Sequence, residues 1–196
     1  MVSKHRRHRA RTDKDPQNER NRVSETRAVM DDQRLLSLVA DGREEAFHRF
    51  YDEYANRVFR YALTLLRSRH LAEEVVQETM VAVWQSASKY AGLSKVSTWV
   101  FGIARNKAFG LLRREERGTR HPDVQLVEPD PADAISREQR VLHAINTLSP
   151  DHKEVVFLAF YEGLAYQEVA QLLDIPEGTV KSRMYHAKRK LAEVLA

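Results

Sequence analysis

The sequence of 196 residues contains no cysteine. This absence excludes disulfide bonds, a cysteine nucleophile, a thiol redox switch within the chain and a cysteine-rich zinc site. No apolar stretch approaches the roughly 18 residues that cross a bilayer, and no apolar segment follows the basic N-terminus, as a signal peptide requires. We therefore expect a soluble, cytoplasmic protein without membrane insertion.

The signatures of catalysis and cofactor binding are missing as well. There is no glycine-rich phosphate loop, no His-Glu-x-x-His motif and no serine elbow, and the 8 histidines are scattered along the chain. The acidic pairs Glu44–Glu45 and Glu115–Glu116 are adjacent residues, which lie on different faces of a helix and do not suit paired acid–base work. The sequence predicts no enzyme, no cofactor and no metal site.

The formal net charge of +4 is unevenly distributed. Residues 1–30 carry 9 Lys and Arg against 4 acids, a net +5, which leaves −1 for residues 31–196. The N-terminal segment has few large apolar residues and no periodic pattern, so we expect a disordered basic tail. Two interpretations of this tail stay open: a solubilising extension or misplaced start codon, and a contact with nucleic acid.

Two basic clusters flank an acidic segment in the rest of the chain. Residues 101–120 carry a net charge of +4, and residues 176–196 carry +3. Between them, residues 122–133 hold 4 acids, no basic residue and 3 of the 6 prolines. Proline at this density prevents a helix and favours an extended path. We therefore predict an acidic, extended linker over residues 118–137 that separates two domains.

The segment before the linker, residues 31–117, has helical periodicity. Apolar residues recur at steps of three and four over residues 47–65, 70–88 and 96–112. The stripe over 70–88 is wide enough to indicate burial on two sides, or a core face beside a partner surface. A shorter apolar cluster precedes these segments and ends at a turn signal at Gly42. No convincing alternation with a period of two is present, so we predict an all-α domain of three or four helices.

The segment after the linker, residues 138–196, is also predicted to be helical, which makes the fold all-α with two small domains. After a first apolar stripe, Ser149-Pro150 has the form of a helix start, with an N-cap oxygen ahead of a proline at the first helical position. The helix that begins there is expected to end at Gly163. A strand over residues 155–157 is the less favoured alternative.

The last thirty or so residues predict a helix-turn-helix. A short helix over 164–173 precedes a turn at 174–176 and a second helix whose apolar residues recur at steps of four, three and four. The second helix of this motif enters the major groove of DNA. Its outward side chains are donors, cations and an aromatic ring, which suit base edges and phosphates. They are Lys181, Ser182, Tyr185, His186 and Arg189.

A solvated basic helix face is the alternative interpretation of the second helix. It does not explain the short helix, the turn or the absence of acids between residues 178 and 192.

Three stretches carry a resemblance to a known family. Ala-Glu-Glu-Val-Val-Gln-Glu-Thr at 72–79 is followed shortly by Ala-Val-Trp. The second stretch is Thr-Trp-Val-Phe-Gly-Ile-Ala-Arg-Asn-Lys at 98–107. The third is Gly-Leu-Ala-Tyr-Gln-Glu-Val-Ala at 163–170 with Gly-Thr-Val-Lys-Ser-Arg at 178–183. In this order they resemble the ECF-type sigma factors of bacterial RNA polymerase, in the sigma-70 family, over about residues 32–195.

The resemblance implies that two helical domains bind core polymerase and divide the promoter between them. The N-terminal domain would bind the clamp helices of the largest subunit through Glu73, Glu74, Gln77, Glu78 and Trp84. It would melt the minus-ten element with Trp99, Arg105, Asn106, Lys107 and Arg113. The C-terminal domain would read the minus-thirty-five element with Lys181, Ser182, Arg183, Tyr185, His186 and Arg189.

Several of these assignments have structural alternatives. Trp99, Asn106 and Arg113 are seven residues apart and share one helix face, where an exposed tryptophan can stack on an unpaired base. Burial of Trp99 in the core is the alternative. Glu73 and Glu74 also fit a solvated face. The acidic linker resembles the family segment that threads the RNA channel, and disordered solvation is its alternative.

Two positions depart from the family pattern. His186 stands where the family often has arginine, which leaves the base preference there open. Gly110 weakens its helix by about 1 kcal/mol relative to alanine, so we expect the melting helix to bend or end early.

The partners implied are core RNA polymerase, through its clamp helices and flap region, promoter DNA and an anti-sigma factor. The alternative function is a free-standing helix-turn-helix regulator with an N-terminal sensing or dimerisation domain.

Overall fold

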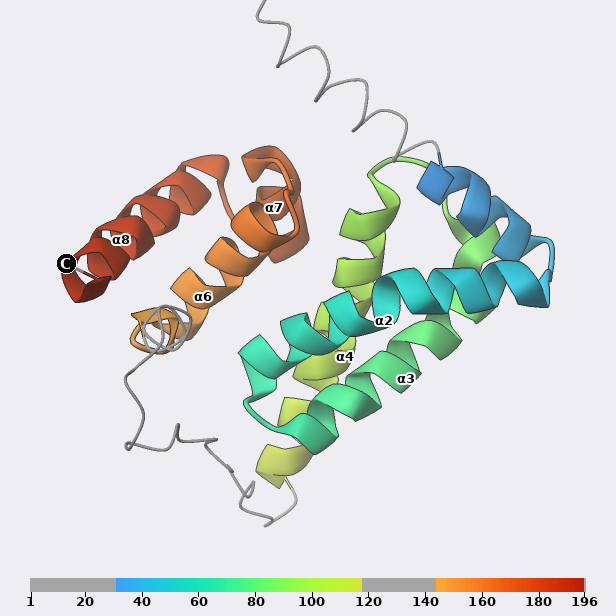
Figure 1. Ribbon diagram of the computed structural model, residues 1–196, viewed down its shortest axis with the longest axis horizontal. Coiled ribbons are helices and arrows are strands. Elements are labelled where there is room, and N and C mark those ends of the chain that lie inside the picture. The colour runs from blue at the N-terminus through green and yellow to red at the C-terminus, as the bar shows by residue number, and fades with distance from the viewer. Residues whose placement is uncertain (1–30, 118–143, 196) are drawn as a thin grey trace, which may run out of the picture.

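Figure 1 shows the computed structural model of the protein, which describes residues 31–117 and 144–195. Within these two ranges the chain is helical and has no strand, so the predicted all-α class is confirmed and the alternative strand over 155–157 is wrong. Among the described helices, none combines the length and the apolarity needed to span a membrane. The predicted tail at 1–30 and linker at 118–137 lie outside the described residues.

The N-terminal domain is a helical bundle. It consists of a helix at residues 31–40, α2 (Glu44–Leu66), α3 (Arg69–Ser86), the 3-10 helix η1 (Ala87–Lys89) and α4 (Val96–Arg117). Helix α3 packs against both α2 and α4. The wide apolar stripe of α3 is therefore explained by burial on two sides of the helix.

The core of this domain is built on an aromatic stripe along α2. Phe50, Tyr54, Val58 and Tyr61 follow one another at steps of four, four and three and are fully buried, as expected for one face of a helix. Phe101 of α4 packs edge-on against Tyr61, with ring centroids 5.3 Å apart. The stripe therefore fixes α4, which carries the proposed melting residues, against α2.

Helix α4 continues through Gly110 to Arg117 as one α-helix, so the expected early end at Gly110 is wrong. Ala108 and Leu111 are buried on either side of the glycine, and Arg114 in the next turn pairs with two glutamates of α3. These contacts outweigh a propensity cost of about 1 kcal/mol.

The C-terminal domain contains the predicted helix-turn-helix. Its elements are α6 (Pro150–Val156), the π-helical turn η2 (Phe157–Tyr161), α7 (Tyr166–Leu173) and α8 (Glu177–Leu195). Helices α7 and α8 meet at a turn in which Asp174 is left-handed, with φ of 55°. Both α6 and α7 pack against α8, which leaves the opposite side of α8 exposed.

Two details of this domain differ from the prediction. Ser149 precedes α6, but its side chain makes no capping hydrogen bond to the helix backbone; its Oγ lies 2.8 Å from Nδ1 of His152. The helix expected to reach Gly163 unbroken widens into η2, where the N–H of Glu162 donates to the carbonyl of Phe157. Gly163, with φ of 64°, does follow its end.

The two domains pack against each other, with α2 on α6 and α4 on α7 (Figure 1). The rings of Tyr61, Phe101 and Phe157 meet at this contact, with centroids 5.3 to 6.4 Å apart. The buried Glu154 of α6 accepts hydrogen bonds on Oε1 from the Tyr61 hydroxyl at 2.6 Å and from Nε of Arg105 at 3.1 Å. Burial raises the pKa of Tyr61, and the Glu154 carboxylate raises it further, so Tyr61 stays a donor.

Two ion pairs extend this contact between the domains. Nη2 of Arg57 lies 2.7 Å from Oε2 of Glu162, and Nζ of Lys95 lies 3.1 Å from Oε2 of Glu168. Burial acts to lower the pKa of Arg57, but the adjacent Glu162 raises it above its ordinary value. In both pairs the N-terminal domain supplies the cation and the C-terminal domain the carboxylate.

Candidate nucleic-acid and polymerase interface

The outward side of α8 is the first component of the site. Val180, Met184 and Ala187 of this helix are buried against α6 and α7, which turns the polar positions outward. We name the α8 face by its exposed members, which are Lys181, Ser182, Tyr185, His186 and Arg189. All five were predicted to point away from the core, and the structure places them there.

The cations of the α8 face have only weak partners within the helix. Nζ of Lys181 lies 2.7 Å from Oε1 of Glu177, and Nε of Arg189 lies 3.5 Å from Oε1 of Glu193. Exposed pairs of this kind contribute little to stability, typically about 0.3–0.5 kcal/mol on a helix. Lys181 and Arg189 can therefore leave their glutamate partners and bind a DNA phosphate instead.

Arg183 differs from the other residues predicted to read the minus-thirty-five element. Its side chain is only 26% exposed, and its Nη2 lies 2.5 Å from Oδ2 of Asp151 at the start of α6. Three residues after Val180 and one before Met184, it stands at the edge of the buried stripe. The structure therefore assigns Arg183 an intramolecular contact that the sequence pattern did not reveal.

The exposed side of α4 is the second component. Asn106 and Arg113 are exposed. Trp99, which precedes Asn106 by seven residues and shares its helix face, is half-buried. The Trp99 ring lies against Tyr90, with centroids 5.4 Å apart. Trp99 is thus neither fully exposed nor fully buried: it packs on the edge of the core and still reaches the surface. We name these three residues the α4 face.

Arg105 and Lys107 stand on opposite sides of the α4 face. Nε of Arg105 lies 3.1 Å from Oε1 of Glu154 in the C-terminal domain. Nζ of Lys107 lies 3.3 Å from Oε2 of Glu78 on α3. In this arrangement neither cation is free for a phosphate, so their predicted DNA contacts require these pairs to open.

The predicted polymerase-binding residues divide between two sides of α3. Glu74 and Glu78 each accept a hydrogen bond from Nη2 of Arg114 at 3.0 Å and so face α4. Glu73, Gln77 and Trp84 are exposed, and so is Val81, a residue that the family resemblance did not point to. We name the α3 face by these exposed members, which are Glu73, Gln77, Val81 and Trp84.

The α3 face combines apolar and polar surface. Val81 is 54% and Trp84 39% exposed, and the Trp84 ring is supported edge-on by Phe47, with centroids 5.0 Å apart. Glu73 forms an exposed ion pair with Arg69 one turn earlier. Apolar side chains rimmed by polar ones are typical of a protein-binding surface.

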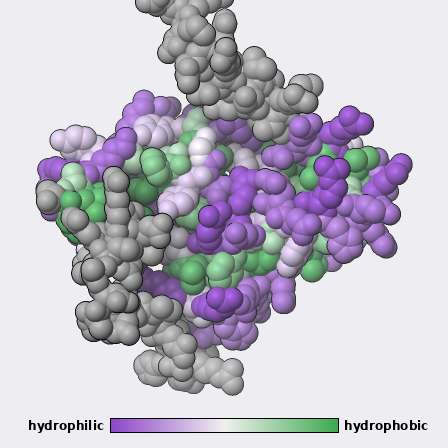
Figure 2. Space-filling view, in the orientation of Figure 1, coloured by the Kyte–Doolittle hydropathy of each residue, from purple (hydrophilic) through white to green (hydrophobic). Residues whose placement is uncertain are grey.

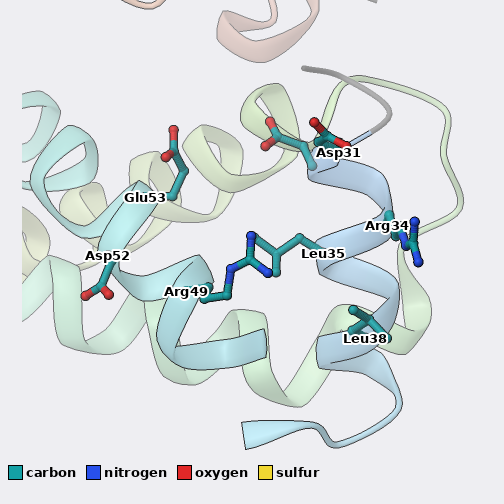
Figure 3. A pocket seen from close by; sticks show the side chains of 8 residues that line it. Asp31, Arg34, Leu35, Leu38, Arg49, Asp52 and Glu53 are labelled. Atoms are coloured by element: carbon teal, nitrogen blue, oxygen red, sulfur yellow. The ribbon is translucent and has the colours of Figure 1, made fainter. Parts of the chain in front are cut away.

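A separate hollow of about 690 Å³ lies between the helix at 31–40 and α2. Arg49 extends across it from α2 toward Leu35, and acidic residues of both helices line its edge (Figure 3). The hydroxyl of Tyr54 donates to Oδ2 of Asp32 at 2.7 Å and ties the two helices together. The right-hand half of Figure 2, which carries the N-terminal domain, is mostly hydrophilic with small apolar patches.

In the described ranges, 31–117 and 144–195, no group of three or more His, Cys, Asp or Glu side chains is arranged to hold a metal ion. The surface features are helix faces, which suit macromolecular partners.

A helix-turn-helix with an exposed basic face, joined to a helical domain with a second polar face, defines a DNA-binding protein with two domains. Residues 50–118 match the family described as Sigma-70 region 2, and residues 138–191 match Sigma-70, region 4. These two ranges cover the α3, α4 and α8 faces.

Similar proteins place the chain more narrowly. The ECF RNA polymerase sigma factor SigK of Mycobacterium ulcerans is 33% identical over 171 residues, which cover 82% of this chain and 91% of the relative. The RNA polymerase sigma factor CarQ of Myxococcus xanthus is 31% identical over 164 residues, 79% of this chain and 92% of the relative. The chain therefore belongs to the ECF sigma factors of bacterial RNA polymerase.

A solved structure agrees with this assignment. The sigma factor RpoE of Bartonella quintana, in complex with the anti-sigma factor NepR, superposes with a TM-score of 0.62 at 25% identity, over 76% of this chain and 96% of that one. The protein is thus a transcription initiation factor that directs RNA polymerase to promoters, and it is not an enzyme.

Proposed function

We propose that the α8 face reads the minus-thirty-five element, the α4 face captures melted bases of the minus-ten element, and the α3 face docks on the polymerase clamp helices. The observation that carries this proposal is the presence of two exposed, donor-rich helix faces in separate domains. Amide and guanidinium groups beside an aromatic ring suit a single strand, and a helix-turn-helix suits a duplex groove. One factor with both faces contacts two parts of a promoter.

We further propose that the packed arrangement of the domains precedes promoter binding. Arg105 is engaged by Glu154, and Lys95 by Glu168, across the contact between the domains. Separation of the domains would release both cations next to the α4 face. The acidic residues at 118–137 suit the RNA channel of the polymerase, with the C-terminal domain at the flap region.

An anti-sigma partner is part of the proposal. The Bartonella quintana relative was solved with one, and the exposed apolar residues of the α3 face offer a surface for such a protein to cover. Because the chain has no cysteine, any thiol or zinc chemistry in the switch resides in the partner. The protein acts in the cytoplasm, where polymerase and DNA are found.

An initiation assay tests the proposed function. Bacterial core polymerase with this chain should start transcription at discrete sites on supercoiled genomic templates, and neither component alone should do so. A free-standing regulator would instead give the chain alone a symmetric footprint on a palindromic duplex, and that result would contradict the proposal.

Replacing Lys181 by alanine should weaken promoter binding by the holoenzyme evenly across upstream sequences. The lysine contributes a point charge to the backbone, so the slope of log affinity against log salt should flatten by about one unit. Filter binding over a range of salt concentrations measures both. Arg49→Ala, which removes an exposed cation from α2, is the matched control and should leave the slope unchanged.

Replacing Val81 by lysine should weaken the affinity for core polymerase by about tenfold or more, because a charge on an apolar contact must be desolvated. Val81 is 54% exposed, so the free energy of unfolding should change little. Fluorescence anisotropy of a labelled chain measures the affinity. Ser37→Lys, exposed on the helix at 31–40, should bind as the wild type, and equal losses in both variants would argue against the α3 face.

A further inference from the structure

The first turn of α6 lies against one side of α8 and adds side chains to its outward surface. Oδ2 of Asp151 holds Nη2 of Arg183 at 2.5 Å. The ring of His152 faces that of His186, with centroids 6.4 Å apart and a tilt of 50°. The surface that carries the α8 face is therefore composite, with members from two helices.

One side of the His152 ring is held by a hydrogen bond at the start of α6. Its Nδ1 lies 2.8 Å from Oγ of Ser149, the contact that replaces the expected backbone cap. A hydroxyl can donate to Nδ1 of a neutral imidazole or accept from the N–H of a charged one. When the hydroxyl donates to Nδ1, or when the ring is charged, Nε2 carries a hydrogen; when a neutral ring donates from Nδ1, Nε2 is an acceptor. Among the described residues Nε2 has no hydrogen-bond partner, so a phosphate placed there selects the states in which Nε2–H donates.

The charged groups that face His152 create a positive surrounding. Arg183, His186 and Lys190 approach from α8, and Asp151 from α6. Burial lowers the pKa of His152, His186 and Arg183 lower it further, Asp151 raises it, and Lys190 lowers it. In the free protein the ring is therefore neutral near pH 7. Because three basic side chains and one acidic side chain surround the ring, an anion is favoured beside it. A DNA phosphate supplies this negative charge when α8 enters a groove.

We propose that His152 is a further DNA-contacting residue, whose Nε2–H donates to a backbone phosphate beside the bases that the α8 face reads. This inference rests on the proposed role of α8 at the minus-thirty-five element. A phosphate beside the ring favours the imidazolium form, so binding takes up a proton. Because the complex binds more protons than the free protein, affinity falls as the pH rises from about 6 to 8.

The test is holoenzyme binding to a duplex that contains the upstream element of a promoter on which this holoenzyme initiates. His152→Ala should lower the affinity about tenfold, equally on the cognate duplex and on one with a changed base. It should also remove part of the dependence on pH. His152→Gln places an amide N–H near the position of Nε2 without a titrating group, so it should restore most of the affinity and leave the pH dependence reduced.

Controls separate the possible failures. If Lys181→Ala leaves binding unchanged in the same assay, the proposed role of α8 fails, and this inference fails with it. If Lys181→Ala weakens binding while His152→Ala binds as the wild type, the inference alone is overturned. A loss confined to one base sequence also overturns it, because a phosphate contact does not discriminate bases. If His152→Ala unfolds, His152→Gln decides: a wild-type pH dependence in that variant overturns the inference.

Discussion

Trp99→Ala is expected to slow open-complex formation by one order of magnitude or more, while the affinity for core polymerase stays within about twofold. Stacking of a base on an aromatic side chain contributes about 1–3 kcal/mol, and this contribution arises only when the strand is open. The α4 face holds Trp99 beside Asn106 and Arg113, which can hold the same strand. Permanganate reactivity of unpaired thymines measures the rate, and polymerase binding is measured separately.

The packing of Trp99 against Tyr90 requires a control for stability. The two ring centroids are 5.4 Å apart, so the variant loses some packing as well as the stacking platform. Tyr90→Leu removes the other ring of the pair and leaves Trp99 in place. It should retain most of the melting activity with a similar loss in the free energy of unfolding. If Trp99→Ala does not fold at all, Trp99 is a core residue and the proposed role is wrong.

Glu154→Ala should loosen the contact between the domains and destabilise the packed arrangement by about 1–3 kcal/mol, the usual cost of leaving a buried polar group without its hydrogen-bond partner. Glu154 is 5% exposed. Its removal leaves the buried hydroxyl of Tyr61 without this acceptor, and Arg105 without the carboxylate. The distance between fluorophores placed on α3 and α8 should increase, and urea should unfold the C-terminal domain at a lower concentration.

Two further variants bracket this prediction. Glu154→Gln keeps an acceptor for Tyr61 and removes the charge beside Arg105, so its effect should lie between those of alanine and the wild type. Asp52→Ala removes an exposed carboxylate from α2 and should change neither measurement. An unchanged distance in Glu154→Ala would show that the ring contacts and the two remaining ion pairs hold the domains together without Glu154.

The sequence predicted the features that depend on neighbours within one helix. The steps of three and four along α2, and the steps of four, three and four along α8, identified both buried stripes. The outward positions of Lys181 and His186 followed from the second pattern. The Ser149-Pro150 pair located the start of α6 for the same reason, since a helix start is a local property.

Features that depend on a second element were not predictable in this way. Arg183 stands at the edge of the α8 stripe, and only its contact with Asp151, 32 residues earlier, decides where its side chain lies. Tyr61 and Glu154 are 93 residues apart, and no periodicity relates them. His152 gave a weak signal, a histidine in the first turn of a helix, but its neighbour His186 became evident only when α6 was placed against α8.

The continuity of α4 through Gly110 has the same origin. Local propensity favoured a break there, by about 1 kcal/mol. Burial of Ala108 and Leu111 in the core, contributed by α2 and α3 as well as by α4, offsets that preference. Local rules were thus reliable where tertiary packing agreed with them and failed where it did not.

Transcription from a library of random promoters by core polymerase with this chain, followed by sequencing of the transcribed promoters, tests most directly whether the two domains read two promoter elements. We expect two sequence elements at a fixed spacing. His186→Ala should relax the preference at one position of the upstream element, by about 1–3 kcal/mol, and Asn106→Ala should affect only the downstream element. Initiation without a shared upstream element, or both substitutions acting on the same element, would show that the α8 and α4 faces do not divide the promoter between them.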